Sequence, residues 1–315
     1  MMIKSTNTFS SGSVICLMGP TASGKSKIAM QLAEKLPIEI VNVDSAIVYR
    51  GMNIGTAKPA PEELAKIQHH LIDIRDPAQS YSAADFRTDA LVAIKKIIAR
   101  GKVPLLVGGT MLYFKALQEG LSELPSADKK IREKISAEAK QIGWQGLHQR
   151  LKKVDPKAAK KIHPNDAQRI QRALEVFMLT GKTISELCGK KKEEASLYEF
   201  INIAIAPKDR KLLHERIERR FEDMLKRGFI DEVKALYGRE DLNRDLPAMR
   251  AVGYRQVWDY LAGDLDFEQM KYKAIVATRQ LAKRQLTWLR SWPNVCWFDS
   301  EALNLVEEIY KLINN

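Results

Sequence analysis

The chain has 315 residues, about twice a typical single-domain length, so the sequence predicts two domains or one domain with an insertion. Its composition, 45% hydrophobic and 29% charged, is that of a globular protein and excludes collagens, coiled coils and low-complexity chains. Three cysteines without a C-x-x-C pair exclude a disulfide scaffold and a cysteine-rich zinc site, and a formal net charge of +12 favours a polyanionic partner.

The N-terminal segment MMIKSTNTFSSGSV lacks the apolar core of a signal peptide, and no run of about 18 apolar residues could span a bilayer. The sparse cysteines are typical of a reducing compartment. We therefore expect a cytoplasmic protein without a membrane partner. We also expect a monomer.

The first third of the chain alternates short apolar runs with helical patterns, which is typical of βαβ units and a parallel sheet. The predicted strands are Val14–Met18, Ile38–Val43, His70–Ile74 and Val103–Val107. Between the third and fourth strands, a capping-box-like start at Ser82 predicts a helix that runs to about Ala99 and is closed by Gly101.

The loop after the first strand, GPTASGKS, matches the P-loop pattern G-x-x-x-x-G-K-[ST] at every fixed position and opens a helix predicted at Ser26–Leu36. In such a loop, successive backbone N–H groups and the helix N-terminus surround an anion, and Lys25 adds a mobile positive charge. Ser26 is placed to ligate Mg²⁺, the expected cofactor. The loop does not determine the attached organic group, so ATP and any organic diphosphate remain open. The predicted diphosphate-binding residues are Gly19, Pro20, Thr21, Ala22, Ser23, Gly24, Lys25 and Ser26.

Two other predicted strands end at the same edge of the parallel sheet, where ligands bind, in Asp44-Ser45 and Gly108-Gly109-Thr110. Asp44 could hold Mg²⁺ through water, act as a general base or cap the next helix. Thr110 offers a hydroxyl to a ligand at the start of a helix, or is an ordinary N-cap. We expect these loops and the P-loop to converge on one crevice.

From Gln118 to about Tyr198 the pattern changes to helix formers and proline-marked turns, and Phe200–Ala206 then returns as a β-type run. The last predicted elements are helices at 208–237, 251–262 and 266–291 and a short strand at Val295–Phe298. The predicted fold is therefore α/β, with a P-loop NTPase-like parallel sheet core, an inserted all-helical domain and C-terminal helices. The core comprises residues 10–117 and 200–315, and the insertion comprises residues 118–199.

The predicted helix at 208–237 carries two arginines of interest. Leu213, Ile217 and Met224 form an apolar stripe at helical spacing, Arg220 takes the remaining place on that stripe, and Arg216 lies one turn earlier. A guanidinium on an inward-facing stripe needs an anion, which is either a bound diphosphate or a carboxylate of the core.

The chain contains, in this order, the segments GPTASGKS, VDSAIVYRGMNIGTAKP, HHLIDIRDPAQSYSAADFR, LLVGGTMLYFKAL, HPNDAQRIQRALEV, RAVGYRQVWDYL and ATRQLAKRQLTWLR. This set, which spans about residues 14–298, resembles the bacterial tRNA dimethylallyltransferase family, also called tRNA isopentenyltransferases. A P-loop alone occurs in many unrelated enzymes, so the specificity of the resemblance lies in the whole set. The resemblance implies transfer of a dimethylallyl group from dimethylallyl diphosphate to N6 of adenosine 37, next to the anticodon, with release of diphosphate and without ATP hydrolysis.

Three catalytic residues are predicted: Asp44, Thr110 and Arg220. An exocyclic adenine amine is a poor nucleophile, and a carboxylate such as Asp44 can orient it and accept its proton. The growing charge on the leaving diphosphate needs backbone amides, Lys25, Mg²⁺ and preferably an arginine. The resemblance implies that an arginine of the R-x-x-x-R helix makes that contact; the apolar stripe points to Arg220, and Arg216 remains the alternative. The resemblance also implies that Thr110 contacts the tRNA.

A base inside a stacked anticodon loop must be extruded before it can react, and the splayed loop must then be held by positive charge and planar side chains. Residues 269–298 contain six basic residues and no acidic one, which suits RNA phosphates. For the segment 168–172 the alternative is a solvated surface helix, and for the segment 249–256 it is an ordinary helix start. The residues expected to contact the anticodon stem-loop are Asp44, Ser45, Ala46, Ile47, Thr110, Arg132, Gln168, Arg169, Ile170, Gln171, Arg172, Met249, Arg250, Ala251, Val252, Gly253, Tyr254, Ala282, Lys283, Arg284, Gln285, Leu286, Thr287, Trp288 and Leu289.

Two other functions remain open from the sequence. A P-loop kinase of a small molecule or nucleotide would leave the insertion and the basic stretch without a use. A non-catalytic RNA-binding protein that uses the P-loop as a nucleotide switch would leave Asp44 and the inward-facing Arg220 unexplained.

Overall fold

The computed structural model describes residues 12–188 and 198–314, which form two compact units. The first unit contains the described residues up to Glu119 together with residues 198–314, and the second contains residues 120–188. The first unit contains the sheet and corresponds to the predicted core. The second corresponds to the insertion that the sequence predicts at 118–199. No helix among these residues has the length and apolar character needed to cross a membrane.

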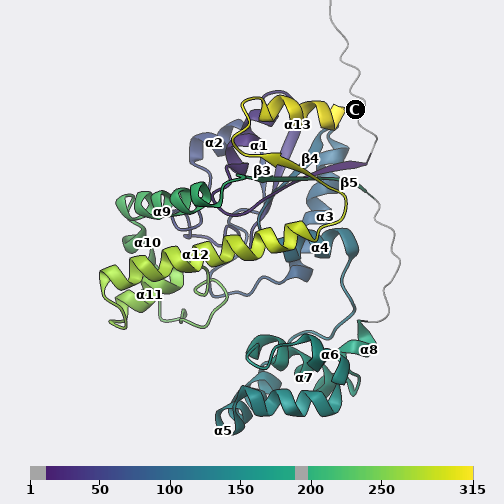
Figure 1. Cartoon of the computed structure of the whole chain (residues 1–315), viewed down its shortest axis with the longest axis vertical. Helices are drawn as coiled ribbons and strands as arrows, with labels where there is room; N and C mark the ends of the chain where they lie inside the picture. The colour runs from purple at the N-terminus through teal and green to yellow at the C-terminus, as the bar shows by residue number, and fades with distance from the viewer. Residues whose placement is uncertain (1–11, 189–197, 315) are drawn as a thin grey trace, which may run out of the picture. The chain divides into compact units, whose positions relative to one another are not determined.

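Within the described residues, six parallel strands form one sheet in the order β3-β2-β4-β1-β5-β6 (Figure 1). The strands are β1 (Ser13–Met18), β2 (Ile38–Val43), β3 (His69–His70), β4 (Val103–Gly108), β5 (Glu199–Ala206) and β6 (Val295–Asp299). All residues of β1, β2 and β4 are buried, as expected for central parallel strands covered on both faces. The predicted parallel sheet is therefore confirmed, including the return of the chain at residue 200.

The third strand is much shorter than predicted. Only His69 and His70 pair with β2, through Ile40 and Val41, whereas the sequence predicts a strand over His70–Ile74. Leu71 and Asp73 have φ angles of 63° and 55°, in the left-handed region, which is incompatible with an extended strand. The prediction is wrong beyond His70 because an apolar run does not reveal these backbone angles.

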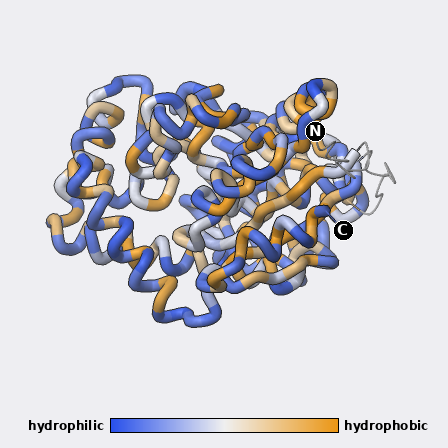
Figure 2. Tube along the Cα trace, turned by 90° about the horizontal axis from the view of Figure 1, so that it is seen from above, coloured by the Kyte–Doolittle hydropathy of each residue, from blue (hydrophilic) through white to orange (hydrophobic). Residues whose placement is uncertain are grey.

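Helices of the first unit pack on both faces of the sheet. Ile15 and Leu17 of β1 belong to a core with α1 (Lys25–Ala33) and α13 (Leu305–Asn314). The alternate residues of β1 belong to a second core on the opposite face. That face is covered by α3 (Ala83–Ala99), α4 (Met111–Glu119), α9 (Arg210–Lys226), α10 (Phe229–Tyr237), α11 (Tyr254–Leu261) and α12 (Phe267–Arg290). The short helix α2 (Pro61–Lys66) contributes no buried residue. In Figure 2 the helices alternate between orange and blue segments, as expected for elements with one buried face.

The long helix predicted at 208–237 is two helices in the structure. The chain leaves α9 after Lys226 and starts α10 at Phe229, with Gly228 at φ 89° between them. A left-handed glycine is a common helix terminator, and here it also sets the new direction of α10. By contrast, Ser82 caps α3 through Asp85 as predicted.

The second unit is all-helical over its described residues. Its helices are α5 (Lys129–Val154), α6 (Pro156–Lys161), α7 (Ala167–Thr180) and α8 (Ile184–Leu187). They share a small core built around Ile135, Leu147, Leu151 and Leu174. The insertion therefore has its own apolar core, separate from those of the sheet.

Candidate active site

Two adjoining pockets open at the carboxyl edge of the sheet. The P-loop pocket, of about 1120 Å³, is lined by residues 21–28 together with Asp44 and residues of the 300–307 segment. The aromatic pocket, of about 540 Å³, is lined by Thr110 and by the rings of Tyr49, Tyr81, Phe221, Phe229, Tyr254 and Trp288. Seven residues line both pockets: Thr21, Asp44, Thr56, Gly109, Arg220, Leu281 and Gln285. The three loops expected to converge, after β1, β2 and β4, therefore do meet in one crevice.

Lys25 of the P-loop is held against the loop itself. Its Nζ donates to Gly19 O at 2.9 Å, to Pro20 O at 2.6 Å and to Ser23 Oγ at 3.3 Å. Burial of the ammonium, together with the nearby charge of Arg220, lowers the pKa of Lys25 to about 7, against the opposing effect of Asp44. An amine whose pKa is lowered by burial and by a neighbouring guanidinium is protonated more readily when an anion lies beside it, so the site favours a polyanion.

Asp44 uses one carboxylate oxygen to shape its own loop. Oδ1 accepts from Ala46 N at 2.8 Å and from Ile47 N at 3.3 Å. The residues that follow form turns rather than a helix, so the helix-capping alternative is wrong. Because the hydrogen bonds of Asp44 with the described residues all use Oδ1, Oδ2 remains for a ligand.

Thr110 fixes the same loop from the opposite side. Its Oγ1 accepts from Ser45 N at 3.1 Å, which ties the turn after β4 to the turn after β2 across 65 residues. The hydroxyl hydrogen stays available as a donor toward the aromatic pocket, which Thr110 lines. Thr110 therefore positions Asp44 and faces the pocket at once.

Arg216 and Arg220 lie one turn apart on α9 and differ in their partners. Arg216 forms an ion pair with Glu301 and donates to Ser300 Oγ at 3.1 Å. Arg220 forms no ion pair among the described residues, and its hydrogen bond with them runs from Nη2 to Thr56 O at 3.5 Å. Burial lowers the pKa of Arg220, and the nearby carboxylate of Asp44 opposes that effect. Arg216 and the exposed Glu301 therefore pair on the wall of the P-loop pocket, whereas Arg220 has no carboxylate partner among the described residues and lines both pockets.

Gln285 of α12 has a role that the sequence did not indicate. It is 9% exposed; its Oε1 accepts from Thr21 N at 2.8 Å, and its Nε2 donates to Gly109 O at 2.9 Å. A Cβ on Gly109 would lie 2.3 Å from Nε2, so this contact requires glycine there. Gln285, which we expect to contact RNA, joins the P-loop to the turn after β4 and lines both pockets. The 300–307 segment was also missed, because nothing in its residue types suggested a pocket wall.

Other predicted RNA-contacting residues of the first unit fall into two groups. Ser45, Ala46, Arg250, Ala251, Val252, Gly253, Arg284 and Trp288 line the aromatic pocket, and Tyr254 contributes its buried ring. Lys283 and Thr287 are exposed on α12. The side chains of Ile47, Met249, Ala282, Leu286 and Leu289 are buried, so these residues offer little side-chain surface to RNA. The prediction of whole segments is therefore too broad, because every amphipathic helix has an inward-facing side.

In the second unit, the predicted arginines converge on one acid. Glu175 is fully buried and accepts from Arg132 Nε at 2.8 Å and from Arg172 Nη1 at 2.6 Å. Arg172 also donates to Pro125 O at 2.6 Å, and Gln171 donates to Arg132 O at 3.2 Å. The pKa of Glu175 is lowered by these donors although burial opposes them. In the same unit Gln168 and Arg169 are exposed, whereas the side chain of Ile170 is buried.

The residues around the P-loop offer few metal ligands. No group of three or more His, Cys, Asp or Glu side chains within residues 12–188 and 198–314 is arranged to hold a metal ion. Ser26 and Asp44 both line the P-loop pocket. Mg²⁺ commonly takes one or two protein oxygens and completes its shell with water and phosphate oxygens, so this small donor set fits Mg²⁺ bound together with a diphosphate.

Comparisons with known proteins agree on one family. A protein-family model described as IPP transferase matches residues 47–292. The tRNA dimethylallyltransferase of Coxiella burnetii (strain RSA 493 / Nine Mile phase I) is 58% identical over 296 residues, which cover 94% of this chain and 95% of the relative.

Solved structures give the same result. The tRNA isopentenylpyrophosphate transferase of Bacillus halodurans has a TM-score of 0.70 at 40% identity and covers 96% of this chain and 95% of its own. The tRNA delta(2)-isopentenylpyrophosphate transferase of Staphylococcus epidermidis has a TM-score of 0.69 at 36% identity, covering 96% and 99%. A eukaryotic dimethylallyltransferase acting on tRNA has a TM-score of 0.76 at 28% identity, covering 96% of this chain and 78% of that one.

Proposed function

The chain belongs to the tRNA dimethylallyltransferase family, and we propose that it transfers a dimethylallyl group from dimethylallyl diphosphate to N6 of adenosine 37 in tRNA. The observation that carries this proposal is the junction of the two pockets. Asp44, Thr56, Arg220 and Gln285 line a polyanion-binding pocket and an aromatic pocket at once. A group transfer between two substrates needs such a shared wall, because the reacting atoms must approach to about 3–3.5 Å.

The P-loop pocket accounts for the leaving group. The amides of residues 19–26 and the N-terminus of α1 suit the diphosphate oxygens, and Lys25 and Arg220 supply two positive charges. Negative charge accumulates on diphosphate as the C–O bond breaks, and preorganised donors stabilise that charge. A bound diphosphate also keeps Lys25 protonated, because its negative charge opposes the burial that lowers the pKa.

The aromatic pocket accounts for the acceptor. An extruded adenine can stack against its rings, with N6 toward Asp44 and Thr110. Asp44 Oδ2 then accepts an N–H bond of the exocyclic amine, orients its lone pair toward the prenyl carbon and takes the proton as the N–C bond forms. Ser45 N, held by Thr110 Oγ1, fixes the loop that carries this carboxylate.

Mg²⁺, when bound with the diphosphate, would neutralise part of the growing charge. Ser26 is the residue we propose to ligate it, with Asp44 as the nearby acid. Asp44 cannot serve equally as metal ligand and base, and its position on the wall of both pockets favours the role of base.

We also propose that the anticodon stem-loop is the part of tRNA that binds. In the first unit its contacts would come from the exposed Arg250, Lys283 and Arg284. In the second unit they would come from Gln168 and Arg169. Arg132 and Arg172 would reach RNA only by sharing their guanidinium groups with Glu175.

The experiment is a direct assay of the product. The purified chain is incubated with Mg²⁺, dimethylallyl diphosphate and unmodified tRNA, and the digested nucleosides are analysed by mass spectrometry. We expect N6-dimethylallyladenosine at position 37 without consumption of added ATP. Phosphorylation of a small molecule from ATP, or tRNA binding without any modified nucleoside, would refute the proposal.

A further inference from the structure

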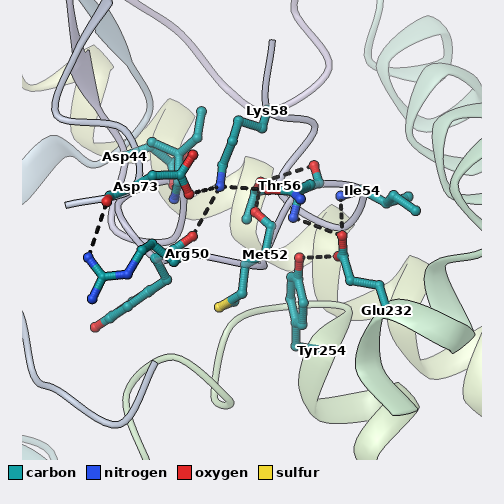
Figure 3. Close-up of polar contacts among 12 residues, drawn as sticks. Asp44, Arg50, Met52, Ile54, Thr56, Lys58, Asp73, Glu232 and Tyr254 are labelled. Carbon is teal, nitrogen blue, oxygen red and sulfur yellow. Dashed lines mark hydrogen bonds and ion pairs between the residues drawn. The ribbon is translucent and has the colours of Figure 1, made fainter. Parts of the chain in front are cut away.

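A single carboxylate holds the first part of the segment at residues 52–58, which we call the Thr56 loop. Glu232 of α10 accepts three consecutive amides: Oε2 from Asn53 N at 2.8 Å and Ile54 N at 2.7 Å, and Oε1 from Gly55 N at 3.1 Å. Tyr254 OH donates to the same Oε1 at 2.6 Å (Figure 3). Successive amides that converge in this way form an anion-binding concavity, and here the anion belongs to the protein.

The other end of the Thr56 loop is fastened by an amine. Lys58 has a side chain that is 5% exposed; its Nζ donates to Tyr49 O at 3.0 Å, Asn53 Oδ1 at 2.8 Å and Asp73 Oδ1 at 2.5 Å (Figure 3). All three donors of an ammonium are thereby used. The loop therefore has a charged group of fixed position at each end.

Packing leaves this loop little freedom between those two ends. A Cβ on Gly55 would lie 2.2 Å from the ring of Phe229 and 2.5 Å from the ring of Tyr254. These two rings pack edge to face with centroids 5.0 Å apart. Ala57 sits at φ 50°, an unfavourable angle for alanine that the surrounding contacts must maintain.

The loop presents the Thr56 carbonyl to Arg220. Arg220 Nη2 donates to Thr56 O at 3.5 Å, and among the described residues no carboxylate lies within ion-pairing distance of that guanidinium. Thr56 lines both pockets, as Arg220 does. The position of Thr56 O therefore sets the orientation of the arginine at the junction.

We propose that Glu232 is a positioning residue for the transfer reaction, which holds the Thr56 loop so that Thr56 O orients Arg220 toward the leaving diphosphate. This inference rests on the proposed function. Glu232 itself lines neither pocket and so would touch no substrate. Its effect is transmitted through the backbone of residues 53–56.

Glu232→Gln is the first test. The amide keeps one acceptor oxygen and turns an NH₂ group toward either the Asn53 and Ile54 amides or the Gly55 amide, so at least one donor loses its partner. We expect faster hydrogen exchange at the amides of Asn53, Ile54 and Gly55. We also expect the single-turnover rate constant to fall about 10- to 100-fold, because a displaced catalytic group loses transition-state contact. The KM for dimethylallyl diphosphate should change much less than kcat.

A double-mutant cycle with Arg220→Ala separates positioning from a general loss of structure. If Glu232 acts through Arg220, adding Glu232→Gln to Arg220→Ala should produce little further fall in the single-turnover rate constant. Fully additive effects would overturn the proposal. Unchanged amide exchange in Glu232→Gln, or faster exchange with an unchanged rate constant, would overturn it as well.

Glu222→Gln is the matched control. Glu222 lies on α9 two residues from Arg220, pairs with Lys271 of α12 at 2.8 Å and does not contact the Thr56 loop, so this variant should keep the wild-type rate constant. If Glu232→Gln does not fold, Tyr254→Phe removes one donor to Glu232 while keeping the ring, and the amides of residues 53–55 should again exchange faster. Amide exchange needs no activity, so it tests this inference even if wild-type protein fails to modify tRNA, an outcome that would refute the proposed function instead.

Discussion

Arg220 in the sheet core and Arg132 with Arg172 in the insertion show two different uses of arginine. In the insertion, two guanidinium groups meet the fully buried Glu175, so their counter-ion is part of the protein. In the sheet core, Arg220 lies near the amine of Lys25 and has no ion-pair partner among the described residues. Removing one partner of an ion pair with a buried acid leaves an uncompensated charge and destabilises a fold, whereas a positive charge without a protein partner at a pocket wall can bind an anionic ligand. The comparison therefore separates structural arginines from a candidate ligand-binding one.

The largest effect is expected at the junction itself. If Asp44 is the base, Asp44→Asn should lower the single-turnover rate constant by about 10²- to 10⁴-fold, because the amide cannot accept the proton. Binding of dimethylallyl diphosphate should be nearly unchanged in a direct equilibrium titration. A large loss of Mg²⁺-dependent diphosphate binding would instead make Asp44 a metal ligand.

Arg220→Ala tests the unpaired arginine. Loss of one preorganised donor to a developing anion typically costs about 10²- to 10³-fold in rate, so we expect a fall of that order in the single-turnover rate constant. Arg216→Ala is the matched control, since Arg216 is committed to Glu301 and should change the rate far less. The reverse ranking would assign the diphosphate contact to Arg216.

Glu175→Gln tests the paired arginines. Replacing the carboxylate removes charge-assisted hydrogen bonds and should destabilise the insertion by about 2–3 kcal/mol, measured by thermal unfolding at pH 7. The pKa of Glu175 is lower in the folded protein than its ordinary value of 4.5, so its contribution is present above pH 4.5 and is lost as the pH falls through the folded pKa. Wild-type protein should therefore lose more stability than Glu175→Gln on acidification below pH 4.5. Equal losses would contradict this role.

The smallest effect is expected on the exposed surface of α12. Replacing both Lys283 and Arg284 with Ala should weaken tRNA binding and reduce its dependence on salt. Each contacted phosphate contributes about −0.7 to −0.9 to the slope of the logarithm of the binding constant against the logarithm of the salt concentration. Lys271→Ala is the control, because Glu222 already neutralises that ammonium. A loss confined to cognate tRNA would mean base recognition rather than phosphate contact.

Local patterns in the sequence predicted most of the helices and strands, and they identified the three loops that meet at the carboxyl edge of the sheet. Apolar-rich runs identify β1, β2, β4 and β5, because strands buried on both faces carry apolar residues at most positions. The P-loop and the Ser82 capping box are recognisable because all their essential residues lie within eight positions of one another. The predicted bounds of the third strand and of the helix at 208–237 are wrong, because a residue with a left-handed φ angle, Leu71 or Gly228, follows the end of the element there.

Tertiary structure alone decided which polar groups meet. Gln285 joins Thr21 and Gly109 across 264 and 176 residues, and Arg216 finds Glu301 across 85. Glu232 reaches the amides of residues 53–55 from about 180 residues away, which no local spacing rule describes. The sequence places Arg216 and Arg220 on the same helix, one turn apart, and gives them the same charge. What distinguishes their surroundings is whether a carboxylate lies within ion-pairing distance of the guanidinium, and that is set by how α9 packs against loops remote in the chain.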